Sequence, residues 1–326
     1  MLLWVPFSLR RTSGEGGLVL EVKEHAAEIF RELGGEVLSG YPAIHSPVFR
    51  TASGTPYLRA PGVVMVARPQ TNLEGLAGFL EGFDAGLGFT QYVRDPTRLP
   101  DSSQLCKSAG QICYMSFGPR RTKNENAAGY FERLVSSGHG SVLEHASFSF
   151  LLYGISRSTT HELVRHRAGV GFSQVSQRYV SGNVLRFVER PEYRQDDELH
   201  RLFEERIDRA RREYGELAGR LIGLQSKGDA ALSADYRTDA RKKVQQTARS
   251  LLPNETEAPM IFTGNVRALR HIIEMRADAH AESEIRALAV RLFLCLVISD
   301  PILFGDYEIS ELPDGSHTVS TPYRKA

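Results

Sequence analysis

The pattern of apolar and polar positions predicts long helices with short strands between them. Apolar residues recur with the period of a helix over about residues 22–33, 103–117 and 126–137, and glycine follows the first and third of these segments. Residues 144–153 alternate instead, with apolar side chains at positions 146, 148, 150 and 152 and serines at 147 and 149. A period of two indicates a half-buried strand.

The second half of the chain carries the longest helical patterns. Helices are predicted over about residues 156–167, 197–226, 234–252 and 265–276, and a last one runs to about residue 299. Short apolar runs at residues 62–67 and 260–262 are strand candidates. Long helices with few strands predict the α+β class rather than repeated βαβ units.

The first 88 residues differ from the rest of the chain. They are rich in glycine and proline, and they carry no motif that indicates chemistry. We therefore divide the chain into an N-terminal extension of unassigned role, residues 1–88, and a main domain, residues 89–326.

Composition restricts the class of partner. The 40 lysines and arginines nearly balance the 39 aspartates and glutamates, so a local cluster of cations has to hold any anionic ligand. The apolar opening of the chain is too short for a secretion signal, and no later apolar run approaches the roughly 20 residues that span a bilayer. These observations argue against nucleic acid and against a membrane as partners.

Cysteine usage indicates a reducing compartment. The three cysteines, Cys106, Cys113 and Cys295, are too few for a disulfide framework and show no CxxC spacing. All three fall in apolar-periodic or apolar stretches, so we expect them to be small core residues. We expect a cytoplasmic protein.

The densest polar cluster is RSTTHELVRHRAGVGFSQVSQRY, residues 157–179. Within the predicted helix, Arg157, His161 and Arg165 are four residues apart and share a face. Guanidinium forks and hydroxyls suit a phosphate group, and the cluster offers Arg165, Arg167, Arg178, Ser173 and Ser176. The residues alone leave a second interpretation open, a solvated face with a salt bridge from Glu162 to Arg165.

A metal site is an alternative use of this stretch, because His161-Glu162 opens like the zinc motif HExxH. The residue four positions on is Arg165, and the next histidine, His166, is five positions on. Five residues turn a helix by about 140°, so the two imidazoles face apart, and the neighbouring arginines repel a divalent cation. We predict no metal site.

Residues 165–179, RHRAGVGFSQVSQRY, resemble the signature of the flavin-dependent thymidylate synthases (ThyX), an Arg-His-Arg followed after a short spacer by Ser-x-Arg-Tyr. Two further blocks match that family in order: GHGSVLEHASFSF at 138–150 and ARSLLPNETEAPMIFTGNVRALRHIIEMRADAHAESEIRALA at 248–289. The resemblance covers about residues 101–301. It has two departures: eight residues rather than the commonest seven separate Arg167 from Ser176, and the acid–amide pair appears as Glu162 and Gln174 rather than Gln and Glu.

The resemblance implies a twisted, mainly antiparallel sheet flanked by long helices, and an enzyme that methylates dUMP to dTMP. In that reaction NADPH reduces FAD, methylenetetrahydrofolate supplies one carbon to uracil C5, and the reduced flavin delivers a hydride. The resemblance also implies a homotetramer with sites at subunit interfaces. No cysteine here lies in the Pro-Cys-His setting of the thiolate-dependent synthases, which fits the flavin route.

The resemblance assigns site residues position by position. It implies flavin contacts at Ser141, Glu144, Arg165, His166, Arg167, Gln174, Asn265, Arg267, His271 and His280. It implies nucleotide contacts at Glu162, Arg165, Gln174, Val175, Ser176, Gln177, Arg178, Arg249 and Arg276. Arg178 and Arg249 are expected on the phosphate, and Arg276 at the uracil edge, where its charge favours the N3-deprotonated ring. Asn265, Arg267 and His271 are expected to reach the flavin from a neighbouring subunit.

Other interpretations stay open for single residues and for the whole chain. Arg249 and Arg276 sit near predicted helix ends and could act only as helix caps, and His280 could be an ordinary core or surface histidine. The extra residue before Ser176 could admit a 2′-hydroxyl, which makes UMP an alternative substrate. A relative that binds a nucleotide or RNA without catalysis is the remaining alternative.

Overall fold

The structure is a computed structural model that describes residues 17–92, 99–118, 127–182, 184–226 and 237–323. Its centre is a six-stranded sheet in the order β1-β2-β5-β6-β9-β7, in which every neighbouring pair is antiparallel. The strands are β1 Gly35–Leu38, β2 Tyr41–Ile44, β5 Gly62–Ala67, β6 Ser147–Tyr153, β7 Val170–Gln174 and β9 Met260–Asn265. The predicted α+β class with a mainly antiparallel sheet is confirmed.

Strand β6 lies in the middle of this sheet and carries the alternating pattern. Phe148 and Phe150 are fully buried, whereas Ser147 is exposed. Phe150 faces Phe262 of β9 in register, and Phe262 stacks on Phe172 of β7 with ring centroids 5.4 Å apart. Cross-strand aromatic pairs of this kind stabilise a sheet. The predicted strand is confirmed, although it begins at Ser147 rather than at residue 144.

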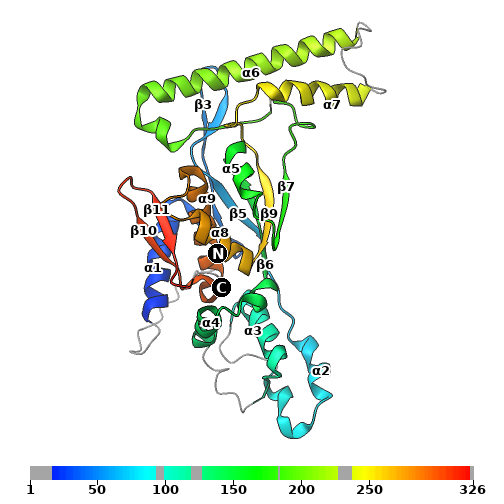
Figure 1. The fold of residues 1–326 in the computed structure, drawn as a ribbon, viewed down its shortest axis with the longest axis vertical. Helices are drawn as coiled ribbons and strands as arrows, with labels where there is room; N and C mark the ends of the chain where they lie inside the picture. Colours follow the sequence, from blue (N-terminus) through cyan, green and yellow to red (C-terminus); the bar gives the residue numbers. More distant parts are fainter. Residues whose placement is uncertain (1–16, 93–98, 119–126, 183, 227–236, 324–326) are drawn as a thin grey trace.

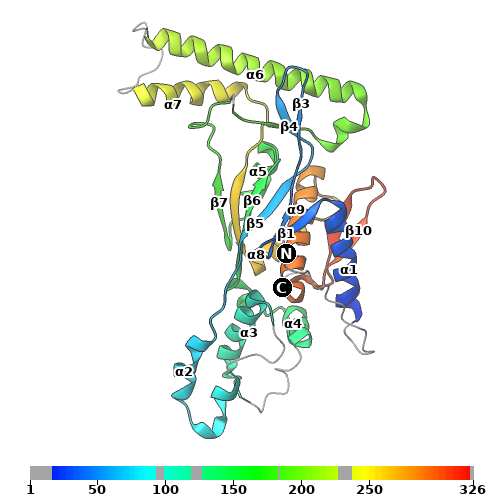
Figure 2. The ribbon, with the colours of Figure 1, turned by 180° about the vertical axis from the view of Figure 1, so that it is seen from behind.

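Helices from both ends of the chain cover one side of the sheet (Figures 1 and 2). α9 (Ser283–Ser299) packs on β2 and β5, and both α8 (Val266–Arg276) and α1 (Gly17–Glu32) pack against α9. α9 is apolar on nearly all sides, and such a helix has to be buried. Its side chains therefore form much of the main hydrophobic core.

The N-terminal segment is built into the same sheet. β1, β2 and β5 supply three of the six strands, and β5 pairs directly with β6. Ile29, Phe30 and Val63 belong to the same hydrophobic core as α9. A second, three-stranded sheet joins β3 (Val48–Arg50) and β4 (Pro56–Leu58) to β8 (Phe187–Val188). The described part of residues 1–88 thus supplies strands and core residues of this fold.

The molecule is elongated, with helices at both ends (Figure 2). At one end the 30-residue helix α6 (Asp197–Ser226) lies beside α7 (Arg237–Ala248), and at the other α2 (Ala77–Glu81) lies beyond α3 (Asp101–Tyr114) and α4 (Ala127–Ser136). No helix in the described ranges is long and apolar enough to cross a bilayer.

The remaining elements are α5 Arg157–Leu163, α10 Pro301–Phe304, β10 Glu308–Glu311, β11 His317–Ser320 and the 3-10 helices η1 Glu74–Leu76, η2 Ala85–Leu87, η3 Phe89–Tyr92, η5 Gly140–Glu144, η6 Pro191–Gln195 and η7 Arg249–Leu251.

Two predicted helices end differently in the structure. The helix predicted over residues 156–167 stops at Leu163, so the Arg-His-Arg stretch lies in the turn beyond it. This turn leads into β7, a strand that the sequence pattern did not predict, because none of its side chains is fully buried. The helix predicted from residue 234 is described only from Arg237, since residues 227–236 lie outside the described residues. It ends at Ala248 and is followed by η7.

Helix α3 turns inward a different face from the one that its apolar pattern predicts. Cys106 is buried as expected, but Cys113 is exposed. The buried face includes Ser103, whose hydroxyl donates to the buried carboxylate of Asp300 at 2.6 Å. A polar helix face can be buried when its groups satisfy one another in this way. The predicted core position is therefore wrong for Cys113 and confirmed for Cys106 and Cys295.

Candidate active site

Helix α5 and the turn after it carry the Arg-His-Arg stretch. The helix begins where the Ser156 side chain accepts a hydrogen bond from the backbone N–H of Thr159, an N-cap that satisfies one of the free donors. Its last turn carries Glu162, and the backbone N–H of His166 still bonds the carbonyl of Leu163 at 3.1 Å. The turn therefore holds His166 close to Glu162.

Helix α8 approaches the same region from β9. Asn265 is its N-cap, and the side-chain oxygen accepts from the backbone N–H of Ala268 at 2.9 Å. Arg267 and His271 follow one turn apart on one face. Arg276 is the last residue of the helix. Its side chain reaches across to the α5 segment.

Arg276 joins the two segments. Its Nη1 donates to Glu162 Oε2 at 2.8 Å, and its Nε donates to His166 Nε2 at 3.0 Å. The His166 ring meets the His271 ring edge to face, with centroids 5.7 Å apart. The structure thus brings together four of the predicted site residues, which we call the Arg276 cluster: Glu162, His166, His271 and Arg276.

The environment of His166 keeps its imidazole neutral. Burial lowers the pKa of His166 to about 4, and the charges of Arg276 and His271 act in the same direction. A neutral ring can accept the hydrogen bond from Arg276 Nε, which a protonated ring cannot. His166 therefore orients Arg276 without competing with it for a proton. Within the described residues Arg276 Nη2 makes no hydrogen bond, so this nitrogen can serve a ligand.

The salt bridge from Glu162 to Arg165, the alternative that the sequence left open, is not formed. Glu162 pairs with Arg276 instead. Arg165, Arg167 and Arg178 are exposed and form no ion pair with any described carboxylate. The Arg178 guanidinium lies 5.5 Å from the centre of the Tyr179 ring. These three guanidinium groups are available for an anionic ligand.

A second group of predicted residues meets at the start of α8. Arg267 Nη1 donates to Glu144 Oε1 at 2.5 Å, and Glu144 belongs to η5, which also carries the exposed Ser141. Arg267 and Arg276 are nine residues apart on one helix, which places them about 13 Å from each other along its axis. Arg267, a predicted flavin contact, and Arg276, a predicted nucleotide contact, therefore lie toward opposite ends of α8.

Residues 174–178 form the turn after β7. Gln174 Nε2 donates to the Thr160 hydroxyl of α5 at 3.3 Å, and the backbone N–H of Val175 donates to the carbonyl of Pro259 at 2.9 Å. The Ser176 hydroxyl accepts from the backbone N–H of Arg178 at 3.3 Å. Gln177 is buried, whereas Arg178 points to solvent. The predicted nucleotide residues from Gln174 to Arg178 thus follow one another at the end of β7.

Two predicted residues stand apart from the Arg276 cluster. Arg249 begins η7 at the end of α7, and its backbone carbonyl accepts from Leu252. The side chain of His280 is 97% exposed, and it bonds the neighbouring carboxylate of Asp278 at 2.9 Å. Neither has a contact with the cluster among the described residues. One copy of the chain therefore does not bring all of the predicted residues together.

The sequence did not single out Gly169, which supports Asn265. Its carbonyl accepts the backbone N–H of Asn265 at 2.9 Å, and its φ of +70° is one that other residues rarely adopt. A Cβ on Gly169 would lie 2.6 Å from Asn265 Nδ2. The AGVG stretch signals a glycine-rich turn, but it does not reveal which side chain packs there.

Positive charge exceeds negative charge at the candidate site. The arginines are Arg165, Arg167, Arg178, Arg267 and Arg276, and the carboxylates that pair with them are Glu144 and Glu162. This local excess, in a chain of near-zero net charge, suits an anionic ligand. In the described part of the chain no three His, Cys, Asp or Glu side chains gather in a metal-binding arrangement.

Comparison with known proteins identifies the family. A sequence model of the family described as "Thymidylate synthase complementing protein" matches residues 96–301. The flavin-dependent thymidylate synthase of Mycobacterium avium (strain 104) is 44% identical over 218 residues, which cover 67% of this chain and 84% of the relative. The proteins of the same name from Mycobacterium tuberculosis (strain ATCC 25618 / H37Rv) and Mycolicibacterium vanbaalenii are both 43% identical, with the same coverage. The chain belongs to the flavin-dependent thymidylate synthase family.

Proposed function

We propose that this chain is a flavin-dependent thymidylate synthase that methylates dUMP at C5 to give dTMP. Methylenetetrahydrofolate is the one-carbon donor and NADPH is the reductant. Bound FAD supplies the hydride that completes the methyl group. The observation that carries the proposal is the Arg276 cluster, in which a carboxylate and a neutral imidazole hold a guanidinium. The exposed Arg165 and Arg167 flank that imidazole in the sequence.

Arg276 is the proposed catalytic residue. Its fork is fixed by Glu162 and His166, and its Nη2 is free among the described residues. A fixed cation at the uracil edge favours the N3-deprotonated, electron-rich ring, because it lowers the energy of the anion that forms. Glu162 and His166 already orient the Arg276 guanidinium. It therefore does not have to move when negative charge develops on the uracil ring.

Four arginines are the proposed anchors for phosphate groups, of which Arg249 is half-buried and the other three are exposed. Arg178 and Arg249 take the phosphate of dUMP, and the turn at Gln174, Val175, Ser176 and Gln177 surrounds the nucleotide. FAD carries a pyrophosphate, and the unpaired guanidinium groups of Arg165 and Arg167 suit it. The other proposed flavin contacts are Ser141, Glu144, His166, Gln174, Asn265, Arg267, His271 and His280.

The cysteines support a route without a protein thiolate. Burial raises the pKa of the Cys106 thiol to about 12 and raises that of Cys295 as well. A protonated thiol is a poor nucleophile. Cys113 lies on the exposed face of α3 and contacts no member of the Arg276 cluster among the described residues.

A homotetramer with sites across subunit interfaces belongs to the same proposal. Arg249 and His280 lie apart from the cluster within one chain, and a neighbouring copy can supply their counterparts. Helix α6 also leaves Leu199, Leu202 and Ile222 more than 40% exposed, which suits an interface. Sedimentation at several concentrations tests this, and a fully active monomer would exclude it. A cytoplasmic location stays a prediction.

Flavin content tests the proposed function. Purified protein should absorb in the blue with about one flavin per chain, since sites of this kind are few in a protein. It should convert dUMP to dTMP when methylenetetrahydrofolate and NADPH are present. UMP in a parallel assay tests the alternative substrate. A colourless protein that FAD cannot reconstitute would refute the proposal.

A further inference from the structure

A cavity of about 510 Å³ lies outside the candidate active site. Its walls are residues 59–61 after β4, helix η6, the first half of α9, and the turn between β10 and β11 at residues 314–317. None of the predicted flavin or nucleotide residues lines it. The first and last of these walls fall outside the range that the family model matches. The cavity is therefore a separate feature of this chain.

Arginines and carboxylates line the cavity in equal number. Arg59, Arg194, Arg286 and Arg291 line it together with four carboxylates, those of Glu189, Glu192, Glu284 and Asp314. The formal charges of these eight side chains sum to zero. A local positive charge remains where an arginine has no carboxylate as its partner. The hydrogen bonds of the carboxylates decide whether this is so.

Two of the carboxylates, Glu189 and Glu284, accept hydrogen bonds from residues next to β4 and α5. Glu189 Oε2 accepts from Arg59 Nε at 2.8 Å, and its other oxygen lies 2.5 Å from His200 Nδ1. Glu284 accepts from both the backbone N–H and the hydroxyl of Ser156, at 2.6 and 2.8 Å. Neither carboxylate bonds Arg194 or Arg291.

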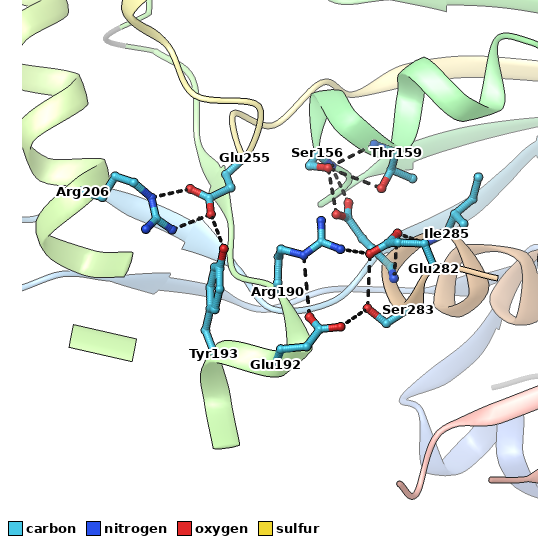
Figure 3. A network of polar contacts seen from close by, with 11 residues as sticks. Ser156, Thr159, Arg190, Glu192, Tyr193, Arg206, Glu255, Glu282, Ser283 and Ile285 are labelled. Atoms are coloured by element: carbon cyan, nitrogen blue, oxygen red, sulfur yellow. Dashed lines mark hydrogen bonds and ion pairs between the residues drawn. The ribbon is translucent and has the colours of Figure 1, made fainter. Parts of the chain in front are cut away.

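The other two carboxylates, Glu192 and Asp314, also have partners. Glu192 accepts from the Ser283 hydroxyl at 2.7 Å and pairs with Arg190, which lies beside it in Figure 3. Asp314 accepts from the Ser316 hydroxyl and lies 3.4 Å from Arg286 Nη2. All four carboxylates of the lining thus contact groups other than Arg194 and Arg291.

Arg194 and Arg291 are left without a counter-ion. Arg291 Nη1 is buried with no acceptor among the described residues, and Arg194 forms no ion pair within the same ranges. Burial, together with the charge of Arg194, lowers the pKa of Arg291 to about 10. The buried Arg291 cation is costly unless an anion joins it.

Part of the remaining lining is apolar. Leu33, Pro61, Val188, Ala287 and Val290 contribute to the walls. A volume of this size is typical of sites for small organic molecules, which combine an apolar lining with a few convergent polar groups. The cavity therefore suits a ligand with a charged head and an apolar body.

We propose that this cavity binds a small organic anion, whose phosphate or carboxylate head bonds Arg291 and Arg194 while its apolar body packs on Val290 and Leu33. Guanidinium groups bind both kinds of head in bidentate fashion. The site is distinct from the proposed flavin and nucleotide sites, and it does not depend on the proposed function.

Calorimetric titration of the full-length protein tests this proposal. The probes are phenyl phosphate and benzoate, which share an aromatic body and differ in the head, and benzylammonium is the control of opposite charge. Binding of a probe at any other site is recognised by the cavity variants, which should leave it unchanged. One of the two anions should bind with one site per chain, and benzylammonium should not bind.

Variants locate the site. Arg291→Gln and Arg194→Gln should each weaken binding of the anion by about tenfold or more, the usual effect of losing a charge-assisted hydrogen bond. Arg212→Gln is the matched control, because Arg212 is an exposed arginine of α6 that does not line the cavity. It should bind as the wild type does.

Two results would overturn the proposal. One is a wild-type protein that binds neither anion, and the other is equal affinity in the wild type and both cavity variants. Arg194 is exposed, so its variant should remain folded even where Arg291→Gln does not, and circular dichroism checks both. Flavin content and dTMP formation are measured separately, so failure of the proposed function is distinguishable from failure of this site.

Discussion

Arg276 and Glu162 form an ion pair of 2.8 Å that joins the end of α8 to the last turn of α5. A guanidinium that only capped its own helix would donate to the last carbonyls of α8. The Arg276 side chain instead donates to Glu162 and to His166. The geometry therefore favours the functional interpretation of Arg276 over the helix-capping one.

Replacing Arg276 by lysine separates charge from shape. Lysine keeps the positive charge but cannot bond Glu162 and His166 with one planar fork. We expect Arg276→Lys to remain folded and to bind FAD, while tritium release from C5-labelled dUMP falls by about 10²-fold, the usual result of losing one preorganised donor. NADPH oxidation without nucleotide should persist.

The same substitution at an exposed position controls for general effects. Arg212→Lys on α6 should leave tritium release unchanged, because Arg212 makes only a long contact of 3.9 Å with Glu216. Near-normal release from Arg276→Lys would mean that the fork is unimportant and would restore the helix-capping explanation.

His166 should titrate far below an ordinary histidine. Its folded pKa of about 4 lies below the usual value of 6.5, so the unfolded chain binds the proton more readily. The fold therefore loses stability as the pH falls from about 6.5 to 4, and this contribution is absent above 6.5. NMR titration of the imidazole C–H signals should give a midpoint below 5. Arg276→Gln should raise that midpoint, because it removes a neighbouring positive charge.

A second measurement checks the sign. The stability of His166→Gln, from urea unfolding at several pH values, should fall less steeply than that of the wild type between pH 6.5 and 4. A His166 midpoint at or above 6.5 would contradict the neutral-ring assignment, and so would equal slopes in the two proteins.

Sequence periodicity predicted the elements that bury one face. β6 has its buried phenylalanines at alternate positions, and α6 was predicted at its observed bounds. Periodicity missed β7, since its side chains are at most half-buried and its position is fixed by hydrogen bonds to β9. It also placed Cys113 in the core, because the contact of Ser103 with Asp300 involves residues almost 200 positions apart.

The candidate site was likewise predicted only in part. The family resemblance, and not residue types and spacing, assigned Glu162 and Arg276 to the nucleotide and His166 to the flavin. It did not predict that Glu162 prefers Arg276 to Arg165, which depends on where α5 ends. The cavity beside α9 was not predicted either, because its walls come from four distant segments.

Ser156 should be important for stability although it lies outside the site. It caps α5, and its backbone N–H and hydroxyl are the partners of the buried Glu284 carboxylate. Ser156→Ala removes the cap and leaves one carboxylate oxygen without its donor. We expect a loss of about 1–3 kcal/mol in the free energy of unfolding, measured by urea titration.

Ser158→Ala provides the matched control in the same helix. Its side chain is partly exposed, so the substitution should cost less than about 0.5 kcal/mol. Equal losses for the two variants would mean that neither the cap nor the contact with Glu284 stabilises α5.

Gly169→Ala tests the link between the glycine-rich turn and the start of α8. Alanine at a φ of +70° costs about 1–2 kcal/mol, and its Cβ would displace the Asn265 side chain that caps α8. Since Asn265 is also a proposed flavin contact, we expect lower thermal stability together with reduced flavin content, measured by absorbance after purification. Gly171→Ala, two residues on in β7, is the control, because its φ is not positive and no atom lies within 4 Å of the added Cβ. Full flavin content in Gly169→Ala would show that Asn265 tolerates displacement, and its proposed role at the flavin would then be wrong.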